Sequence, residues 1–136
     1  MSKTIIPAGY RIHVTTWEND ADNYKTETIE GVAREHIPFI VEVCKLLRSG
    51  SNNGGATFGN LYEENTDGLV KALDELIQKH PDRPEDCESG EAIFECLLSD
   101  LGFTNSEYYT TRVFDKIKIE YVPSKIVLED VTDQFI

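Results

Sequence analysis

The 136-residue sequence has no long apolar run and little positive charge. No stretch reaches the roughly 18 consecutive apolar residues that a membrane-spanning helix needs, and residues 1–9 lack the apolar region of a signal peptide. Lysine and arginine number 13 against 25 aspartates and glutamates, so the formal net charge is −12. Proteins that bind nucleic acid by neutralising phosphates need a basic face. This charge balance therefore argues against direct binding of nucleic acid or of an anionic membrane.

Cysteine is also scarce, with three residues in the chain, Cys44, Cys87 and Cys96. An odd number without a signal sequence predicts free thiols in a reducing, cytoplasmic compartment. Cys44 and Cys96 fall within apolar helical patterns, where cysteine usually packs as a small buried hydrophobe. Cys87 stands among acidic residues, which we expect to raise the pKa of its thiol. Neither a C-x-x-C motif nor a histidine pair at ligand spacing is present, so the sequence predicts no metal and no cofactor.

The strand patterns of the chain lie near its two ends. In residues 10–17, the more apolar side chains fall on one face (Tyr10, Ile12, Val14 and Thr16) and the more polar ones, with Trp17, on the other (Arg11, His13 and Thr15). The segment is also rich in β-branched and aromatic residues, which is typical of a strand. Residues 24–29 resume this composition after a polar turn, so the two segments predict a hairpin. Residues 108–122 return to β character, with Asp115 marking a bulge or a tight turn. Residues 126–128 are a last short extended piece.

Three helices are expected between these strands, over residues 34–49, 66–80 and 90–101. Each segment repeats apolar residues at spacings of three and four, which predicts a helix with one buried face. Pro38 is tolerated because it falls in the first turn. Ser89 or Asp86 can cap the start of the third helix, and Gly102 its end. We therefore predict a single α+β domain over residues 1–136, with a small antiparallel sheet, formed by the N-terminal hairpin and the C-terminal strands, packed on three helices.

Negative charge is concentrated between Asp82 and Glu107, where eight acidic residues accompany one base, Arg83. Glu91 and Glu95 are four residues apart and so share a face of the third expected helix, opposite its apolar stripe. A row of carboxylates can occupy a basic groove that normally binds phosphates. The candidate partner-binding residues are Glu85, Asp86, Glu88, Glu91 and Glu95. A solvated helix face without a partner explains the same charges equally well.

A second candidate patch consists of Trp17 and Asp20, at the polar turn of the expected hairpin. Tryptophan is a frequent anchor in protein interfaces, although packing in the core suits Trp17 as well. The alternating oxygen-bearing side chains of residues 18–23 are similar to a calcium loop. Glycine and glutamate are missing from the positions where an EF-hand requires them, so we interpret this segment as a turn.

No catalytic motif accompanies His13, His36 and His80, which are far apart in the sequence, so we predict no catalytic residues. The glycine-rich residues 50–59 lack the Lys-Ser or Lys-Thr pair that completes a phosphate loop. Their polar side chains leave an alternative open, the binding of a small nucleotide-like signal molecule. The candidate ligand-binding residues are Arg11, Lys45, Arg48, Asn52, Asn53 and Thr57.

The segment TTWENDADNYKTE, residues 15–27, follows Gly9-Tyr10-Arg11-Ile12-His13-Val14. This part of the chain resembles the start of small uncharacterised acidic proteins of tailed bacteriophages. The resemblance covers about the first quarter of the chain and includes no site motif. It implies a protein of the host cytoplasm that binds a host protein or sequesters a small signal molecule. We therefore expect a non-enzymatic, phage-encoded inhibitor of a host nucleic-acid enzyme or defence factor, acting by protein–protein contact. A component of the virion is a third hypothesis.

Overall fold

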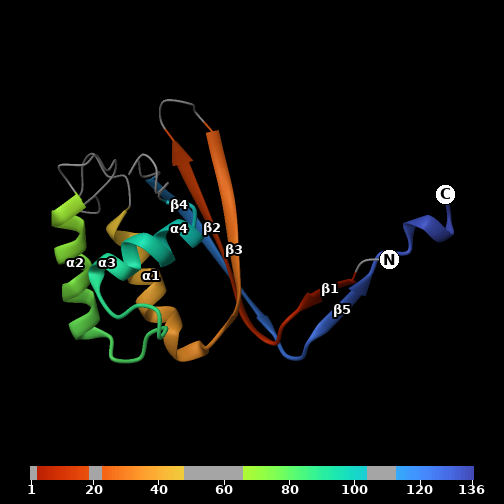
Figure 1. Ribbon diagram of the computed structural model, residues 1–136, viewed down its shortest axis with the longest axis horizontal. Coiled ribbons are helices and arrows are strands. Elements are labelled where there is room, and N and C mark those ends of the chain that lie inside the picture. The colour runs from red at the N-terminus through yellow and green to blue at the C-terminus, as the bar shows by residue number, and fades with distance from the viewer. Residues whose placement is uncertain (1–2, 19–22, 48–65, 104–112) are drawn as a thin grey trace.

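The computed structural model describes residues 3–18, 23–47, 66–103 and 113–136. They form two antiparallel sheets and three main helical segments, so the predicted α+β class is confirmed (Figure 1). The strands are β1 (Lys3–Ile6), β2 (Gly9–Glu18), β3 (Asn23–Val32), β4 (Val113–Val122) and β5 (Ile126–Glu129). The helices are α1 (Ile37–Leu46), α2 (Thr66–Lys79) and a composite third helix of α3 (Gly90–Ala92), the π-helical η3 (Ile93–Leu97) and α4 (Leu98–Asp100). The 3₁₀ turns are η1 (Arg34–His36) and η4 (Thr132–Gln134).

The main sheet has three antiparallel strands in the order β3-β2-β4. Strands β2 and β3 form the predicted hairpin. On the other side of β2, Thr15 is opposite Lys116 and Thr16 is opposite Phe114, so Asp115 is the extra residue of a β-bulge. One of the two alternatives for Asp115 is thereby confirmed. Thr15 and Thr16 are both buried, which breaks the simple alternation of β2.

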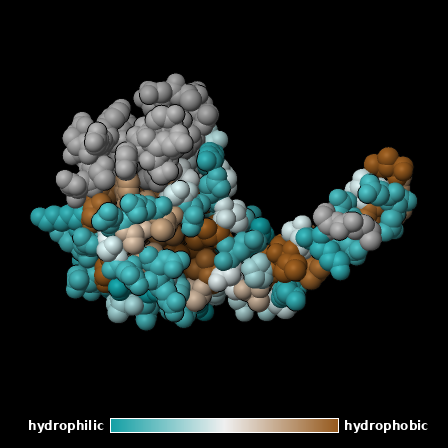
Figure 2. Space-filling view, in the orientation of Figure 1, coloured by the Kyte–Doolittle hydropathy of each residue, from teal (hydrophilic) through white to brown (hydrophobic). Residues whose placement is uncertain are grey.

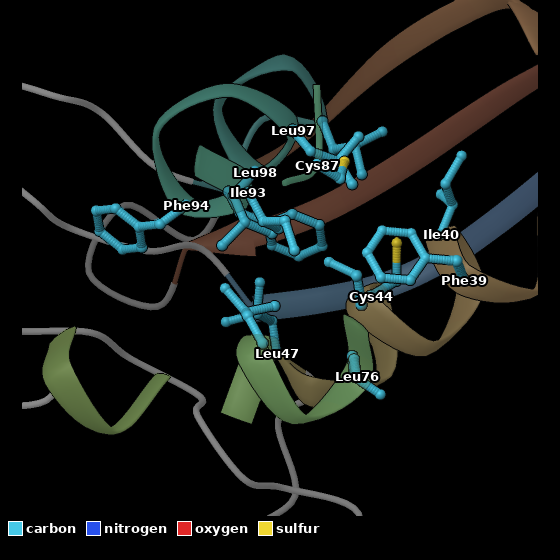
Figure 3. Packing of buried hydrophobic residues seen from close by; sticks show 14 of the residues in the cluster. Phe39, Ile40, Cys44, Leu47, Leu76, Cys87, Ile93, Phe94, Leu97 and Leu98 are labelled. Atoms are coloured by element: carbon cyan, nitrogen blue, oxygen red, sulfur yellow. The ribbon is translucent and has the colours of Figure 1, made fainter. Parts of the chain in front are cut away.

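All three helices cover one face of this sheet, which we call the inner face (Figure 1). Ile12 and Val14 point from β2 into the core with no exposed surface. The apolar side chains of α1, α2 and the composite third helix pack against one another in that core (Figure 3). Cys44 of α1, Leu73 of α2 and Leu98 of the composite third helix are fully buried, as the predicted apolar face of each helix requires. None of the described helices is long and apolar enough to span a membrane.

The opposite side of the sheet, which we call the outer face, carries none of the described helices (Figure 1). Successive side chains of a strand point to opposite faces. The neighbours of Ile12 and Val14 on β2, such as His13, therefore point outward. The residues of β3 and β4 that are paired with these neighbours, such as Thr28 and Lys118, point outward as well. The outer face is polar and largely exposed.

The third helix has a defined start and a defined end. The Ser89 hydroxyl accepts a hydrogen bond from the Ala92 amide at 3.1 Å, as an N-terminal cap should. At the other end, Gly102 adopts a positive φ of 86°. The Phe103 amide donates to the Leu98 carbonyl at 2.8 Å, which is the bond that closes a Schellman motif. The two caps therefore define where the helix begins and ends, and with that which of its residues face away from the core.

The second sheet is a two-stranded ribbon of β1 and β5. Together with η4 this ribbon forms an arm, residues 3–6 and 126–136, that projects away from the helices (Figure 1). The sequence patterns predict that the C-terminal strands share one sheet with the hairpin. Strand β4 does join that sheet, but the prediction is wrong for β5, which pairs with β1, a strand that no sequence pattern indicated.

Gly90 lies where the third helix meets α2. Its amide donates a hydrogen bond of 2.6 Å to Oδ1 of Asp74. A Cβ atom at this position would overlap the carbonyl oxygen of Val70, a backbone atom that cannot rotate away. The close approach of the two helices therefore requires glycine here.

We expect Gly90→Ala to lower the free energy of unfolding by about 1–3 kcal/mol, because the added methyl group forces the helices apart. Denaturant unfolding followed by circular dichroism measures this change. The control is Gly68→Ala at an exposed position of α2, where better helix propensity should raise stability by up to about 1 kcal/mol. Equal effects of the two substitutions would contradict this account of the helix contact.

Candidate functional site

The acidic segment, residues 82–100, begins in the connection after α2 and continues through the composite helix. Arg83 Nε donates to the carbonyl oxygen of Cys87 at 2.8 Å, and Nη1 donates to that of His80 at 3.2 Å. The single base of the segment therefore ties the connection to the end of α2. It forms no ion pair with a carboxylate of the described chain.

The five predicted partner-binding carboxylates of this segment are all exposed. None of them takes part in an ion pair with another described residue. Glu91 stands in the first turn of the composite helix, where a negative charge also interacts favourably with the helix dipole. Ile93 and Leu97 are buried while Glu91 and Glu95 are exposed, as the predicted separation of the two faces requires.

Part of the acidic segment borders a hollow of about 300 Å³, which we call the acidic hollow. It lies between the end of β3, the start of α1, the connection at residues 84–87 and the composite helix. Glu30, Asp86 and Asp100 are the acidic residues among those that line it, and Ile40 and Leu97 are among the apolar ones. Of the five predicted partner-binding acids, Asp86 lines the hollow, whereas the other four do not.

The acidic residues that line the hollow differ in their partners. Glu30 forms an ion pair with Arg11, at 3.1 Å between Oε2 and Nε. Asp86 and Asp100 have no cationic partner within the described residues. The hollow therefore combines a partly apolar wall with two carboxylates whose charge is not neutralised by a described neighbouring side chain.

Two cysteines line the same hollow. Burial, and next the adjacent Asp86 carboxylate, raise the pKa of the Cys87 thiol to about 11, so the thiol is protonated at neutral pH. The predicted direction is confirmed, with burial as the larger cause. Cys96 is exposed, so the expectation that it packs as a buried hydrophobe was wrong. Cys44 does pack in the core, and burial raises its pKa to about 12.

A second hollow, of about 280 Å³, lies on the outer face of the main sheet. His13, Thr15, Thr26, Lys116, Lys118 and Glu120 line it. The Glu120 carboxylate is shared by three cationic or potentially cationic groups. It lies 3.6 Å from Nη1 of Arg11, 2.5 Å from Nε2 of His13 and 3.4 Å from Nζ of Lys118. Lys116 forms no ion pair within the described part of the chain, so the outer hollow is cationic.

His13 bridges two strands on this outer face. Its Nδ1 lies 2.7 Å from the Thr28 hydroxyl, and its Nε2 contacts Glu120. No sequence pattern indicated this hydroxyl–imidazole–carboxylate row, because its members come from three strands, β2, β3 and β4. A similar order of groups occurs in serine hydrolases, but here the row lies on an exposed sheet face and its carboxylate is shared with Arg11 and Lys118. We interpret the row as a cross-strand network that stabilises the sheet.

The structure separates the second predicted patch from the acidic segment. Trp17 is partly buried on the outer face, opposite the exposed Tyr24, whereas the helices occupy the inner side. Asp20 lies outside the described residues.

The residues of the alternative ligand site are not brought together where they are described. Arg11 is on the outer face and pairs with Glu30, whereas Lys45 is on α1 and lies 3.8 Å from Glu42. The other four candidates, Arg48, Asn52, Asn53 and Thr57, lie outside the described residues. Within the described ranges, no group of three or more His, Cys, Asp or Glu side chains is arranged to hold a metal ion.

The pH dependence of stability should report the His13–Glu120 contact. The hydrogen bond from His13, and next the Lys118 ammonium, hold the pKa of Glu120 below its usual 4.5. A carboxyl group with a lowered folded-state pKa stabilises the fold above its unfolded pKa, and this contribution is lost as the pH falls through the folded pKa. The stability difference between wild type and Glu120→Gln should therefore be constant above about pH 5 and shrink below pH 4.5.

Denaturant unfolding between pH 3 and 7 provides the measurement for this prediction. The same substitution in a His13→Phe background is the control, and there the pH dependence should be weaker because the main cause of the pKa shift is gone. Wild-type and Glu120→Gln curves that stay parallel over the whole range would show that this contact does not contribute to stability.

Comparison with known proteins gives no further lead: no family model matches the chain, and neither curated proteins nor solved structures match it.

Proposed function

We propose that this protein is a non-enzymatic binding protein that recognises a basic partner protein at the acidic hollow and the adjoining acidic segment. In the setting that the N-terminal resemblance implies, it is phage-encoded and acts in the host cytoplasm. The partner is then a host nucleic-acid enzyme or defence factor, which the protein inhibits by occupying a surface that otherwise binds phosphates.

The observation that carries this proposal is the composition of the acidic hollow. Its wall combines apolar side chains with Asp86 and Asp100, neither of which has a cationic partner among the described residues. Arginine and lysine have an apolar stem and a charged head, so a basic side chain of a partner can contact both kinds of surface. A volume of about 300 Å³ is at the lower end of the range for binding pockets, which suits one or two inserted side chains.

The positions of the carboxylates that have cationic neighbours support the acidic segment, rather than the outer face, as the surface for a basic partner. On the outer face, Arg11, His13 and Lys118 surround Glu120, and Arg11 also pairs with Glu30. In the acidic segment the only base, Arg83, donates to backbone carbonyls. The uncompensated charge that a basic partner would neutralise is therefore on the side of the composite helix.

A deca-arginine peptide serves as the probe for this proposal. We expect it to bind wild-type protein with an affinity that falls steeply between low and high salt, since exposed charges are screened. The double variant Asp86→Asn/Asp100→Asn should weaken binding about tenfold, which corresponds to roughly 1.4 kcal/mol. The control Glu42→Gln/Glu75→Gln makes the same change in net charge at positions of α1 and α2 away from the hollow and should stay within about twofold of wild type.

Isothermal titration calorimetry measures the affinity of each variant for the peptide. The thiol of Cys96 reports independently on where the peptide binds. Because Cys96 lines the hollow, bound peptide should slow its modification by a maleimide. Equal weakening by both double variants, or unchanged Cys96 labelling, would show that the peptide responds to the overall field rather than to this site. Wild-type and Asp86→Asn/Asp100→Asn proteins can then be compared as baits in a host lysate.

A second candidate function is the binding of a small anionic, nucleotide-like ligand, and the cationic outer hollow favours it. Lys116 and Lys118 line this hollow and can donate hydrogen bonds to phosphate oxygens, and so can one of the Thr15 and Thr26 hydroxyls, which are 2.8 Å apart and hydrogen-bonded to each other. This location differs from the glycine-rich loop that the sequence analysis considered.

A thermal-shift measurement against a panel of nucleotides tests this second function. A ligand present at 100 times its Kd should stabilise the fold by about 2.7 kcal/mol and raise Tm by several degrees. The shift should disappear in Lys116→Gln/Lys118→Gln and persist in Lys71→Gln/Lys79→Gln, which removes the same charge from α2. A panel without any shift leads us to reject a nucleotide ligand.

A further inference from the structure

Exposed apolar side chains are concentrated on the arm. Among the described residues, the large exposed apolar side chains of the arm are Ile5, Ile126, Val127, Leu128, Val131, Phe135 and Ile136. Ile119 and Tyr121 add to them on β4, next to the base of the arm. Apolar patches recur along the arm and cover its C-terminal end (Figure 2). Exposed apolar patches on one short element are typical of a site of protein interaction.

No described element covers either face of the ribbon within the arm. Ile6 is opposite Ile126, and Ile5 is opposite Val127. Because successive residues point to opposite faces, aliphatic side chains lie on both sides of the ribbon. Val127 is 51% and Leu128 is 53% exposed. A two-stranded ribbon with four residues in each strand is marginally stable by itself, so this one requires a further strand or surface.

The sequence of β5 and its flanking lysine is complementary to itself. Residues 125–129 read Lys-Ile-Val-Leu-Glu. If two copies of this segment pair in antiparallel fashion about Val127, Ile126 faces Leu128 of the other copy and Lys125 faces Glu129. Every apolar residue then has an apolar neighbour and every charge has an opposite charge, twice over, as a two-fold interface requires.

We propose that the arm binds the arm of a second copy of this chain. The two β5 strands pair through their free edges and form a four-stranded sheet of order β1-β5-β5-β1. The other edge of the ribbon is less suited to pairing. Strand β1 ends before Pro7, which has no amide hydrogen to donate, and carries no residue that would neutralise Lys3 of a second β1.

Antiparallel pairing also explains why apolar residues outside the ribbon are exposed in a single copy. The tip of one arm comes to lie beside the base of the other, because the two strands run in opposite directions. Phe135 and Val131 at the tip are thereby brought toward Ile119 and Tyr121 of the second copy. The arm projects away from the helices, so the two acidic bodies stay apart despite a net charge of −12 on each (Figure 1).

Light scattering of the full chain during gel filtration tests this proposal. Wild-type protein should show twice the mass of the 15.4 kDa chain and should dissociate on dilution. Lys125→Glu places two pairs of glutamates across the interface, and Glu129→Lys places two pairs of lysines there. We expect each single variant to raise the Kd for dimerisation at least tenfold.

An equal mixture of the two variants is the decisive measurement. In a mixed dimer, the glutamate introduced into one chain faces the lysine introduced into the other, and the two unchanged residues, Glu129 and Lys125, face each other. All four charges are then complementary again, so the mixture should recover a Kd within about threefold of wild type. Because Glu129 is also opposite Lys3 within the arm, Val127→Lys is a further variant that puts two lysines at the two-fold axis and should be monomeric.

Controls separate the interface from general charge and from folding. Lys71→Glu on α2 makes the same charge change as Lys125→Glu and should leave the dimer intact. Far-UV circular dichroism should be the same for all variants, since the core lies between the helices and the main sheet. A wild-type monomer at a few hundred micromolar would leave the arm to a different partner and overturn the proposal. Failure of the mixture to associate, or dissociation by Lys71→Glu, would overturn it as well.

Discussion

The burial of only one face of the main sheet is the constraint on which the rest of the structure depends. Ile12 and Val14 of β2 have no exposed surface, because the three helices cover their side of the sheet. The composite helix uses its apolar stripe in this core, so its acidic side is directed to solvent. The same one-sided packing leaves the outer face of the sheet polar. Each surface with a proposed role is thus a side that the core does not use.

The two charged surfaces differ in how their carboxylates are compensated. Strand pairing places Arg11, His13 and Lys118 around Glu120, since neighbouring strands bring opposite charges together. The acidic segment has no such neighbours among the described residues, and Arg83 is held by the backbone carbonyls at the end of α2. The surplus negative charge is therefore uncompensated around the composite helix. Partner recognition by charge is best supported at this surface.

Local patterns in the sequence were sufficient to predict the helices and the hairpin, because spacing along the chain determines which side chains share a face. At Asp115 they left two alternatives, a bulge or a tight turn, and the pairing of β2 with β4 decides for the bulge. They could not predict β1, whose pairing depends on β5 more than 100 residues away. The acidic hollow could not be predicted either, since β3, α1 and the composite helix come together around it only through tertiary packing. Cys96 was assigned to the core from the usual burial of cysteine. The apolar stripe of its helix is complete without it.

The arm and the acidic hollow lie on different parts of the chain, so one can function without the other. Pairing through β5 nevertheless changes what the acidic hollow can achieve. A dimer of the proposed kind would carry two hollows on bodies at opposite ends of the four-stranded sheet, and a partner with two basic sites, or a partner that is itself a dimer, would engage both. The second contact is then intramolecular, so avidity exceeds the affinity of one site. For a small protein whose single hollow has room for only one or two side chains, dimerisation would be a direct way to gain strong binding without a larger interface.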